Sequence, residues 1–355
     1  MNKPLFVSLA IVCACGESGP RGPSRGSVVA DLVHDTALPH HESLGTSSAA
    51  LPPAFEFCAA PNAAAITAAQ DAWRLAASDW AGVEAFFYGP AKDDHVDAAV
   101  WFWPTRPELI EELLAGDAPI DAALVDGFGA ADKGLPAIEA QLFDPTGGDV
   151  LTRFDPADPI AARRCALVRE LAIDVGEHAG ALAETWSSGY ADDLAEPPNP
   201  RYEDERAALD EMVNGIIFLL QLVDDHKLGI PFGSKSNGMA QPDMVESRYA
   251  DQSLAAIATN LATVRKLYLG VGDGLGLQDL VLARSPMLDD EIVLALDQAD
   301  AAIAAIPPPL RVAVGDSFVP VQNAIDAVKQ LRRLFTADLP QQLGVTVTIS
   351  DNDGD

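Results

Sequence analysis

The strongest constraint on the fold is a helical spacing of apolar residues that returns along most of the chain. In the alanine-rich segment 62–87, Ile66, Ala69 and Trp73 stand three or four residues apart, which places them on one face of an α-helix. The alternation typical of β-strands is nearly absent, apart from residues 345–349. The sequence therefore predicts an all-α fold.

Other segments with helical spacing predict further helices and divide the chain into two parts. They cover residues 107–114, 135–143, 159–186, 202–227, 251–269, 287–305 and 316–339. A proline-rich stretch at 191–201 separates the two groups and is expected to be a linker. We expect antiparallel helical bundles of the four-helix type on either side of it, one over residues 53–190 and one over residues 202–355.

The N-terminus has the features of an export signal. Lys3 precedes an apolar stretch that is too short to cross a bilayer. The stretch ends in a sequence that resembles a bacterial lipobox, so residues 1–15 are predicted to be a lipoprotein signal with lipid on Cys15. An ordinary secretory cleavage nearby is the alternative. Residues 16–52, rich in Gly, Pro, Ser and His, show no sustained periodicity and are predicted to be a flexible, solvated tether.

The cysteines support export. Cys13 would leave with the signal and Cys15 would carry the lipid, which leaves Cys58 and Cys165 as an even pair in an oxidising compartment. We predict that these two are bridged, with two buried thiols as the alternative. The expected location is the bacterial cell envelope, facing the periplasm. Gly16 after Cys15 resembles the sorting rule for the outer membrane.

Charge and missing motifs exclude several functions. The chain has 53 acidic and 23 basic residues, a net charge of −30, so its surface repels phosphate backbones and nucleic-acid binding is excluded. The sequence contains no Gly-rich phosphate loop, serine elbow or His-Glu-x-x-His pattern. Nucleotide hydrolysis, acyl transfer and thermolysin-type proteolysis therefore have no support.

Five segments, taken in order, resemble the imelysin family of exported bacterial proteins. They are Trp80 to Pro90, Phe102-Trp103-Pro104, Lys133 to Phe143, Val245-Glu246-Ser247 continuing to Tyr268-Leu269-Gly270, and Leu343-Gly344-Val345 with Asp353-Gly354-Asp355. The resemblance spans about residues 55–355. It implies two all-α domains built on four-helix bundles, a place in the periplasm or at the outer membrane, and a link to iron acquisition. Some members of the family are described as metallopeptidases.

One departure from the family pattern affects the expected chemistry. The signature Gly-x-His-x-x-Glu keeps Gly134 and Glu139, but Pro136 stands where the histidine is usual. In the usual signature, an imidazole and a carboxylate three residues apart lie on one helical face and could share a metal. Proline has no side-chain donor atom, so we expect no catalytic site of that kind here.

Four polar residues in the family-like segments are candidates for a cleft site. Glu139 is either a ligand or a carboxylate that ties one helix to its neighbour. Glu84 follows Trp80 and is expected to share the core-facing side of its helix, where a buried acid must be paired or metal-bound. A solvated face is the alternative. Glu246 and Ser247 match a family motif, and Ser247 could instead cap a helix.

The leading hypothesis is therefore a non-catalytic, imelysin-like envelope lipoprotein that binds a ligand between its bundles and takes part in iron acquisition. Its cofactor is undetermined, with iron or another divalent cation as candidates. Its expected partners are the membrane, through the lipid anchor, and iron-uptake components. The alternatives are a metal-dependent peptidase, which needs three ligands and an open position, and a structural envelope protein.

Overall fold

The computed structural model describes residues 22–144 and 147–348, and all regular secondary structure within these ranges is helical. The predicted all-α fold is confirmed. The longer helices are α1 (Arg25–Leu32), α2 (Leu38–Ala49), α4 (Ala63–Val83), α7 (Pro107–Ala115), α9 (Gly134–Leu142), α10 (Ala161–Thr185), α12 (Glu205–Gln221), α14 (Ser253–Leu269), α16 (Pro286–Ala304) and α18 (Phe318–Arg333). The shorter ones are α3 (Leu51–Ala54), α5 (Pro90–Asp93), α6 (Val96–Val100), α8 (Ala122–Asp126), α11 (Ala191–Ala195), α13 (Ile230–Phe232), α15 (Leu277–Leu282), α17 (Leu310–Asp316) and α19 (Leu339–Leu343).

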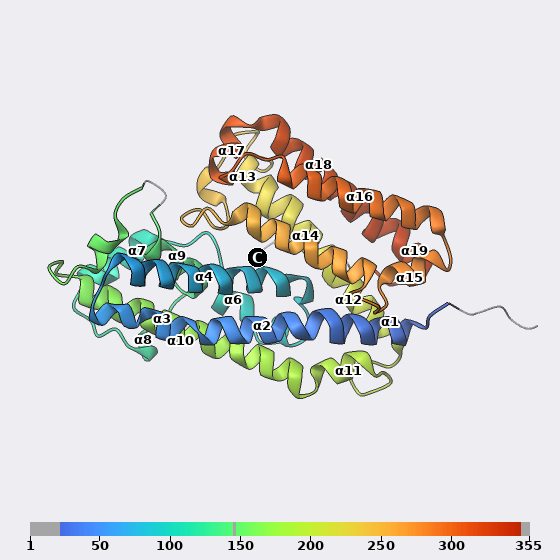
Figure 1. Ribbon diagram of the computed structural model, residues 1–355, viewed down its shortest axis with the longest axis horizontal. Coiled ribbons are helices and arrows are strands. Elements are labelled where there is room, and N and C mark those ends of the chain that lie inside the picture. The colour runs from blue at the N-terminus through green and yellow to red at the C-terminus, as the bar shows by residue number, and fades with distance from the viewer. Residues whose placement is uncertain (1–21, 145–146, 349–355) are drawn as a thin grey trace, which may run out of the picture.

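The helices form two groups that share one core. Helices α2, α4, α9 and α10 contact one another, and helices α12, α14, α16 and α18 form the second group (Figure 1). The groups meet where α14 packs on α4 and where α12 packs on η3 (Glu84–Phe86). A single cluster of buried apolar side chains runs through both groups. None of the described helices is both long enough and apolar enough to cross a bilayer.

The prediction of a flexible tether over residues 16–52 is wrong from Ser24 onward. Helix α1 begins at Arg25, after Ser24 has capped it by accepting a hydrogen bond from the N–H of Ser27. Val28 is fully buried, and α1 contacts α12 and α15 of the second group. Helix α2 packs between α4 and α10 (Figure 1). The predicted signal and Cys15 lie outside the described residues.

Small residues explain why composition suggested a tether. A Cβ atom added at Gly45 of α2 would lie 2.8 Å from the Cβ of Ala183 on α10, so the absence of a side chain lets the two helices approach closely. A Cβ at Gly26 of α1 would meet the carboxylate of Glu205 at 2.6 Å. The glycines and serines that are typical of flexible segments here serve tight helix packing.

His41, expected to be solvated, lies in the core. It is fully buried, its ring stacks on Trp186 with centroids 4.0 Å apart, and its Nδ1 atom lies 2.7 Å from the carbonyl oxygen of Ala37. Burial is the main cause that lowers the pKa of His41 from 6.5 to about 3. Below pH 6.5 the imidazole of His41 therefore binds a proton in the unfolded chain but stays neutral in the folded chain. The free energy of unfolding falls as a result.

We expect His41 to cost the wild-type protein up to about 2 kcal/mol of unfolding free energy between pH 6.5 and pH 5. His41→Leu should lose less stability than wild type over that interval, whatever its stability at pH 7. Urea unfolding at the two pH values measures this, with the exposed His34 replaced by leucine as the control. Equal pH dependence in wild type and His41→Leu would contradict the assignment.

Cys58 and Cys165 form the predicted disulfide. Their Cα atoms lie 5.7 Å apart, and the bond joins residues separated by 107 positions. It fastens η2 (Phe55–Ala59) to α10. The cross-link therefore closes a large loop within the first helix group.

Removing the bridge with Cys58→Ser and Cys165→Ser should lower the free energy of unfolding by about 3–5 kcal/mol, because so long a loop loses much chain entropy when it is closed. Denaturant unfolding of the oxidised wild type, the reduced wild type and the double variant measures the effect. A difference below about 1 kcal/mol would show that the bridge contributes little.

Several helices continue through π-helical segments. Helix α10 is followed by η6 (Trp186–Tyr190), where the chain kinks at Gly189 with φ +156°, and then by α11, so the first residues of the expected linker 191–201 are helical. Helix α12 passes likewise through η7 (Leu222–Gly229) into α13. Such segments are often found at functional sites, and η7 contributes to the site described next.

Candidate functional site

Four buried polar side chains meet at the junction of the two helix groups. Lys227 in η7 donates a hydrogen bond of 2.6 Å to Oε2 of Glu84 and one of 3.0 Å to Oδ1 of Asn260 on α14. Its Nζ atom also lies 2.9 Å from Oε1 of Glu246. All four residues are at most 6% exposed. One ammonium group therefore lies among three converging oxygen atoms, in a place that is almost closed to solvent.

The charges in this cluster depend on one another. Burial by itself would lower the pKa of Lys227, but Glu246 and Glu84 outweigh it and the pKa is raised, so the amine stays charged. Burial raises the pKa of Glu246 to about 7, against the attraction of Lys227. The cluster holds two carboxyl groups and one cation, and removing any member would leave a buried group unpaired.

Asn260 ties the cluster to the end of helix α4. Its amide nitrogen donates to the carbonyl oxygen of Ala81 and to Oε2 of Glu84, each at 2.8 Å. Its side-chain oxygen accepts from Lys227, so both ends of the amide are used. Helix α14 is thereby fixed against α4 by polar contacts as well as by packing.

The π-helical segment η7 presents two buried charges to different neighbours. Lys227 lies against Glu84 of the first group. Asp224, fully buried, lies 3.1 Å from Nε of Arg332 on α18. Burial is the main cause that raises the pKa of Asp224 to about 7, and Arg332 opposes it. The segment therefore links the first helix group to α18.

Glu139 positions the loop that carries Glu246. Its Oε1 atom accepts hydrogen bonds from the backbone N–H groups of Tyr249 and Ala250, at 3.0 and 2.7 Å. Burial raises the pKa of Glu139 to about 8, although these two hydrogen bonds lower it. Of the two interpretations left open by the sequence, the contacts match a carboxyl group that ties its helix to a neighbouring segment.

Gly134 and Ser247 have backbone roles. Gly134 has φ +78°, and a Cβ atom there would lie 2.6 Å from the carbonyl oxygen of Val100, so only glycine allows α9 to begin against α6. Ser247 does not cap α14, which begins at Ser253. Instead its N–H donates to the Ser253 hydroxyl at 3.3 Å, so the capping interpretation is wrong.

The structure thus brings together most of the residues expected from sequence and adds two that were not. Glu84 and Glu246 meet directly, and Glu139 and Ser247 lie on or against the same loop. Lys227 and Asn260 were not assigned to the site from sequence. The only signal pointing to Lys227 was the requirement that a buried Glu84 have a partner.

The donor set does not fit a bound divalent cation. Lys227 occupies the point where the oxygens of Glu84, Glu246 and Asn260 converge. Within residues 22–144 and 147–348, no three His, Cys, Asp or Glu side chains are arranged to hold a metal ion. Pro136, buried in the first turn of α9, offers no donor atom beside Glu139.

An aromatic cleft adjoins the cluster. It has a volume of about 370 Å³ and shares Glu84 with the cluster. Its walls include Trp80, Trp101, Phe102 and Trp103. Among the described residues, the ionisable ones that line it are Glu84, Asp97 and His226. Burial raises the pKa of Asp97 and lowers that of His226, so the cleft offers planar apolar surface with no permanent positive charge.

Comparison with known proteins identifies a family and a relative with similar sequences. The family model for imelysin matches residues 37–336. The chain is 26% identical over 332 residues to iron-regulated protein A of Synechococcus elongatus, covering 89% of this chain and 86% of the relative.

Two solved structures have the same fold. A protein described as an iron-regulated protein A precursor, from Parabacteroides distasonis, matches with a TM-score of 0.79 and 24% identity, covering 92% of this chain and 97% of the other. An imelysin-like protein from Psychrobacter arcticum matches with a TM-score of 0.72 and 20% identity over the same shares. Because the family model spans most of the sequence, this chain belongs to the imelysin family.

Proposed function

We propose that this chain is a non-catalytic binding protein of the cell envelope that takes part in iron acquisition and holds a ligand in the aromatic cleft beside Lys227. The observation that carries the proposal is the position of the Lys227 ammonium among Glu84, Glu246 and Asn260. A peptidase of the metal-dependent type needs those donors, or others like them, free for an ion and a water molecule.

The same observation limits the form in which iron could bind. A bare ion would have to displace a buried, hydrogen-bonded ammonium group, so we infer that iron reaches the protein as a chelate. The cleft lining is aromatic and carries carboxyl groups from Glu84 and Asp97, which disfavour an anionic ligand. A neutral or cationic ferric chelate of the hydroxamate type therefore suits the cleft better than an anionic one. The iron-regulated relative supports the iron setting.

Isothermal titration calorimetry with ferrioxamine B, a cationic ferric trihydroxamate, tests the proposal. We expect saturable binding. Trp103→Ala should weaken it at least about tenfold, because the variant removes one aromatic wall of the cleft. Phe318→Ala is the matched control, because Phe318 is 63% exposed and does not line the cleft. Absence of binding, or equal effects of both variants, would overturn the cleft assignment.

The proposal that the protein is not a peptidase has a separate test. Purified mature protein should contain no stoichiometric zinc by elemental analysis, and unfolded casein should survive incubation with it equally with and without a chelator. Metal-dependent cleavage of casein would contradict a non-catalytic role and support the metal-dependent peptidase. The lipid anchor is tested by mass spectrometry of the N-terminal peptide, which should carry a diacylglyceryl group on Cys15.

A further inference from the structure

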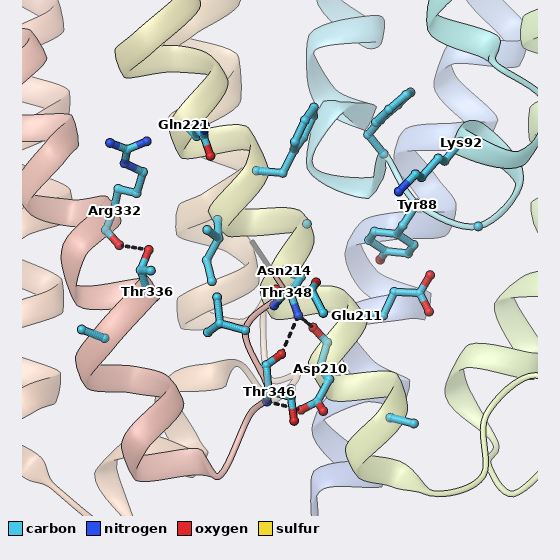
Figure 2. A pocket seen from close by; sticks show the side chains of 18 of the residues that line it. Tyr88, Lys92, Asp210, Glu211, Asn214, Gln221, Arg332, Thr336, Thr346 and Thr348 are labelled. Carbon is cyan, nitrogen blue, oxygen red and sulfur yellow. Dashed lines mark hydrogen bonds between the residues drawn. The ribbon is translucent and has the colours of Figure 1, made fainter. Parts of the chain in front are cut away.

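A second and larger cleft, with a volume of about 1040 Å³, lies next to the aromatic one. Phe87 and Phe218 line both, and their rings are stacked with centroids 5.5 Å apart. The first helix group contributes Tyr88 and Lys92 to this cleft, and α18 with the segment after it contributes Arg332 and Thr336 from the opposite side (Figure 2).

The charge of this cleft is opposite to that of the chain. The whole sequence has more than two acidic residues for each basic one, 53 against 23. Among the described residues, the cleft instead is lined by five basic and three acidic ones. The basic residues are Lys92, Arg201, Lys329, Arg332 and Arg333, and the acidic ones are Asp93, Asp210 and Glu211. Because the surrounding surface repels anions, such a concentration of positive charge is a local attraction for them.

The acidic side chains of the cleft already have partners. Asp93 lies 3.6 Å from Nη1 of Arg201. Asp210 accepts a hydrogen bond of 3.1 Å from the N–H of Thr346, and Glu211 accepts one of 3.4 Å from the hydroxyl of Tyr190. Each of these three carboxylates therefore already contacts a donor group of the protein.

Two of the basic side chains have no such partner. Arg332 and Arg333 pair with Asp224 and Asp338, at 3.1 and 2.7 Å. Lys92 and Lys329 form no ion pair with any residue in the described ranges. Lys92 belongs to α5 in the first helix group and Lys329 to α18 in the second. The charge of Lys329 also lowers the pKa of Asp224, but neither lysine is held in a direct ion pair there. Two such ammonium groups therefore border one cavity from the two groups of the fold.

The C-terminal segment completes the wall of the cleft. Asn214 on α12 donates to the carbonyl oxygen of Thr346 at 2.9 Å and accepts from the N–H of Thr348 at 2.8 Å (Figure 2). Arg206 donates to the Thr346 hydroxyl at 2.6 Å. The β-branched residues 345–348 thus form no strand and are pinned along α12. Their hydroxyl groups add neutral hydrogen-bonding groups to this wall.

We propose that this second cleft binds a small polyanion, with carboxylate or phosphate groups, between Lys92 and Lys329. The site goes beyond the proposed function, because the ligand is anionic and the cleft is separate from the one beside Lys227. A ligand with at least two negative groups would satisfy both ammonium groups and would link the two helix groups. The stacked rings of Phe87 and Phe218 add apolar surface to its lining.

Calorimetric titration of the full chain with citrate and with pyrophosphate, each at low ionic strength, tests this proposal. We expect binding of at least one of them, weakened at least about tenfold by raising the salt to 0.5 M, because exposed charges are screened. If only citrate binds, the ligand is a carboxylate. If only pyrophosphate binds, the ligand is a phosphate. If both bind, the site recognises negative charge of either kind.

The variants separate loss of positive charge inside the cleft from loss of positive charge elsewhere. Lys92→Met with Lys329→Met should weaken binding at least about tenfold, whereas Lys92→Arg with Lys329→Arg should retain it within a few fold. Lys266→Met removes an exposed lysine that does not line the cleft and should leave affinity unchanged. All these side chains are exposed, so the variants should fold. Binding of neither anion up to 10 mM, or binding that the double methionine variant retains, would overturn the proposal.

Discussion

Lys227→Met should lower the free energy of unfolding by about 3–5 kcal/mol, the largest effect that we expect from a single substitution in this chain. Methionine fills a similar volume, so the loss reflects charge and hydrogen bonding. Without the ammonium group, the carboxyl groups of Glu84 and Glu246 would face each other in a site that excludes water. Denaturant unfolding at pH 7 measures the change.

Two further variants separate this explanation from a general packing defect. Adding Glu84→Gln and Glu246→Gln to Lys227→Met removes the unpaired charges and should restore at least half of the lost stability. Lys266→Met, which removes an exposed lysine on α14, should change stability by less than about 0.5 kcal/mol. If the triple variant is no more stable than Lys227→Met alone, the charge argument is wrong.

Glu139→Ala should lower the free energy of unfolding by about 3–4 kcal/mol, because it leaves the buried N–H groups of Tyr249 and Ala250 without an acceptor and opens a cavity. Glu139→Gln should lose less than about 1 kcal/mol at pH 7. Its amide oxygen can still accept both hydrogen bonds, and the raised pKa of about 8 keeps Glu139 protonated at that pH.

The glutamine variant also predicts a change in pH dependence. A carboxyl group whose pKa is raised on folding binds its proton more tightly in the folded state, so its contribution to stability falls as pH rises from about 4.5 to about 8. Wild type should therefore lose stability over this range by up to about 1.4 kcal/mol per pH unit more than Glu139→Gln. Unfolding curves at pH 5, 6.5 and 8 measure the slopes, and parallel slopes would contradict a buried, neutral Glu139.

The sequence predicted most of the long helices because their apolar residues recur with helical spacing. It failed over residues 24–52, where glycine, serine and proline suggested a solvated tether. Those residues form helices whose small side chains let α2 approach α10, with no Cβ at Gly45 to meet Ala183. Composition cannot distinguish a small residue that gives flexibility from one that permits close packing, because the difference depends on what lies opposite.

The candidate site was predicted in part for a similar reason. Family resemblance drew attention to Glu84, Glu139 and Glu246, and burial required a partner for Glu84. That partner, Lys227, follows His226 in a π-helical segment and has no distinctive neighbours in the sequence. It lies 143 positions from Glu84, and a separation of that size carries no local signal of contact.

The amino-acid sequence by itself determined the helical fold, the family and the loss of an imidazole at Pro136, because periodicity, motif order and residue type are properties of the chain alone. Only the tertiary structure decided what the buried carboxyl groups do. It placed an ammonium group among Glu84, Glu246 and Asn260 and gave Glu139 two backbone N–H groups to hold. It also brought Lys92 and Lys329 to one cleft, with no ion pair to either from the residues that the structure describes. The physical reason is that charge and hydrogen-bond complementarity act over a few ångströms in space, between residues that are far apart along the chain.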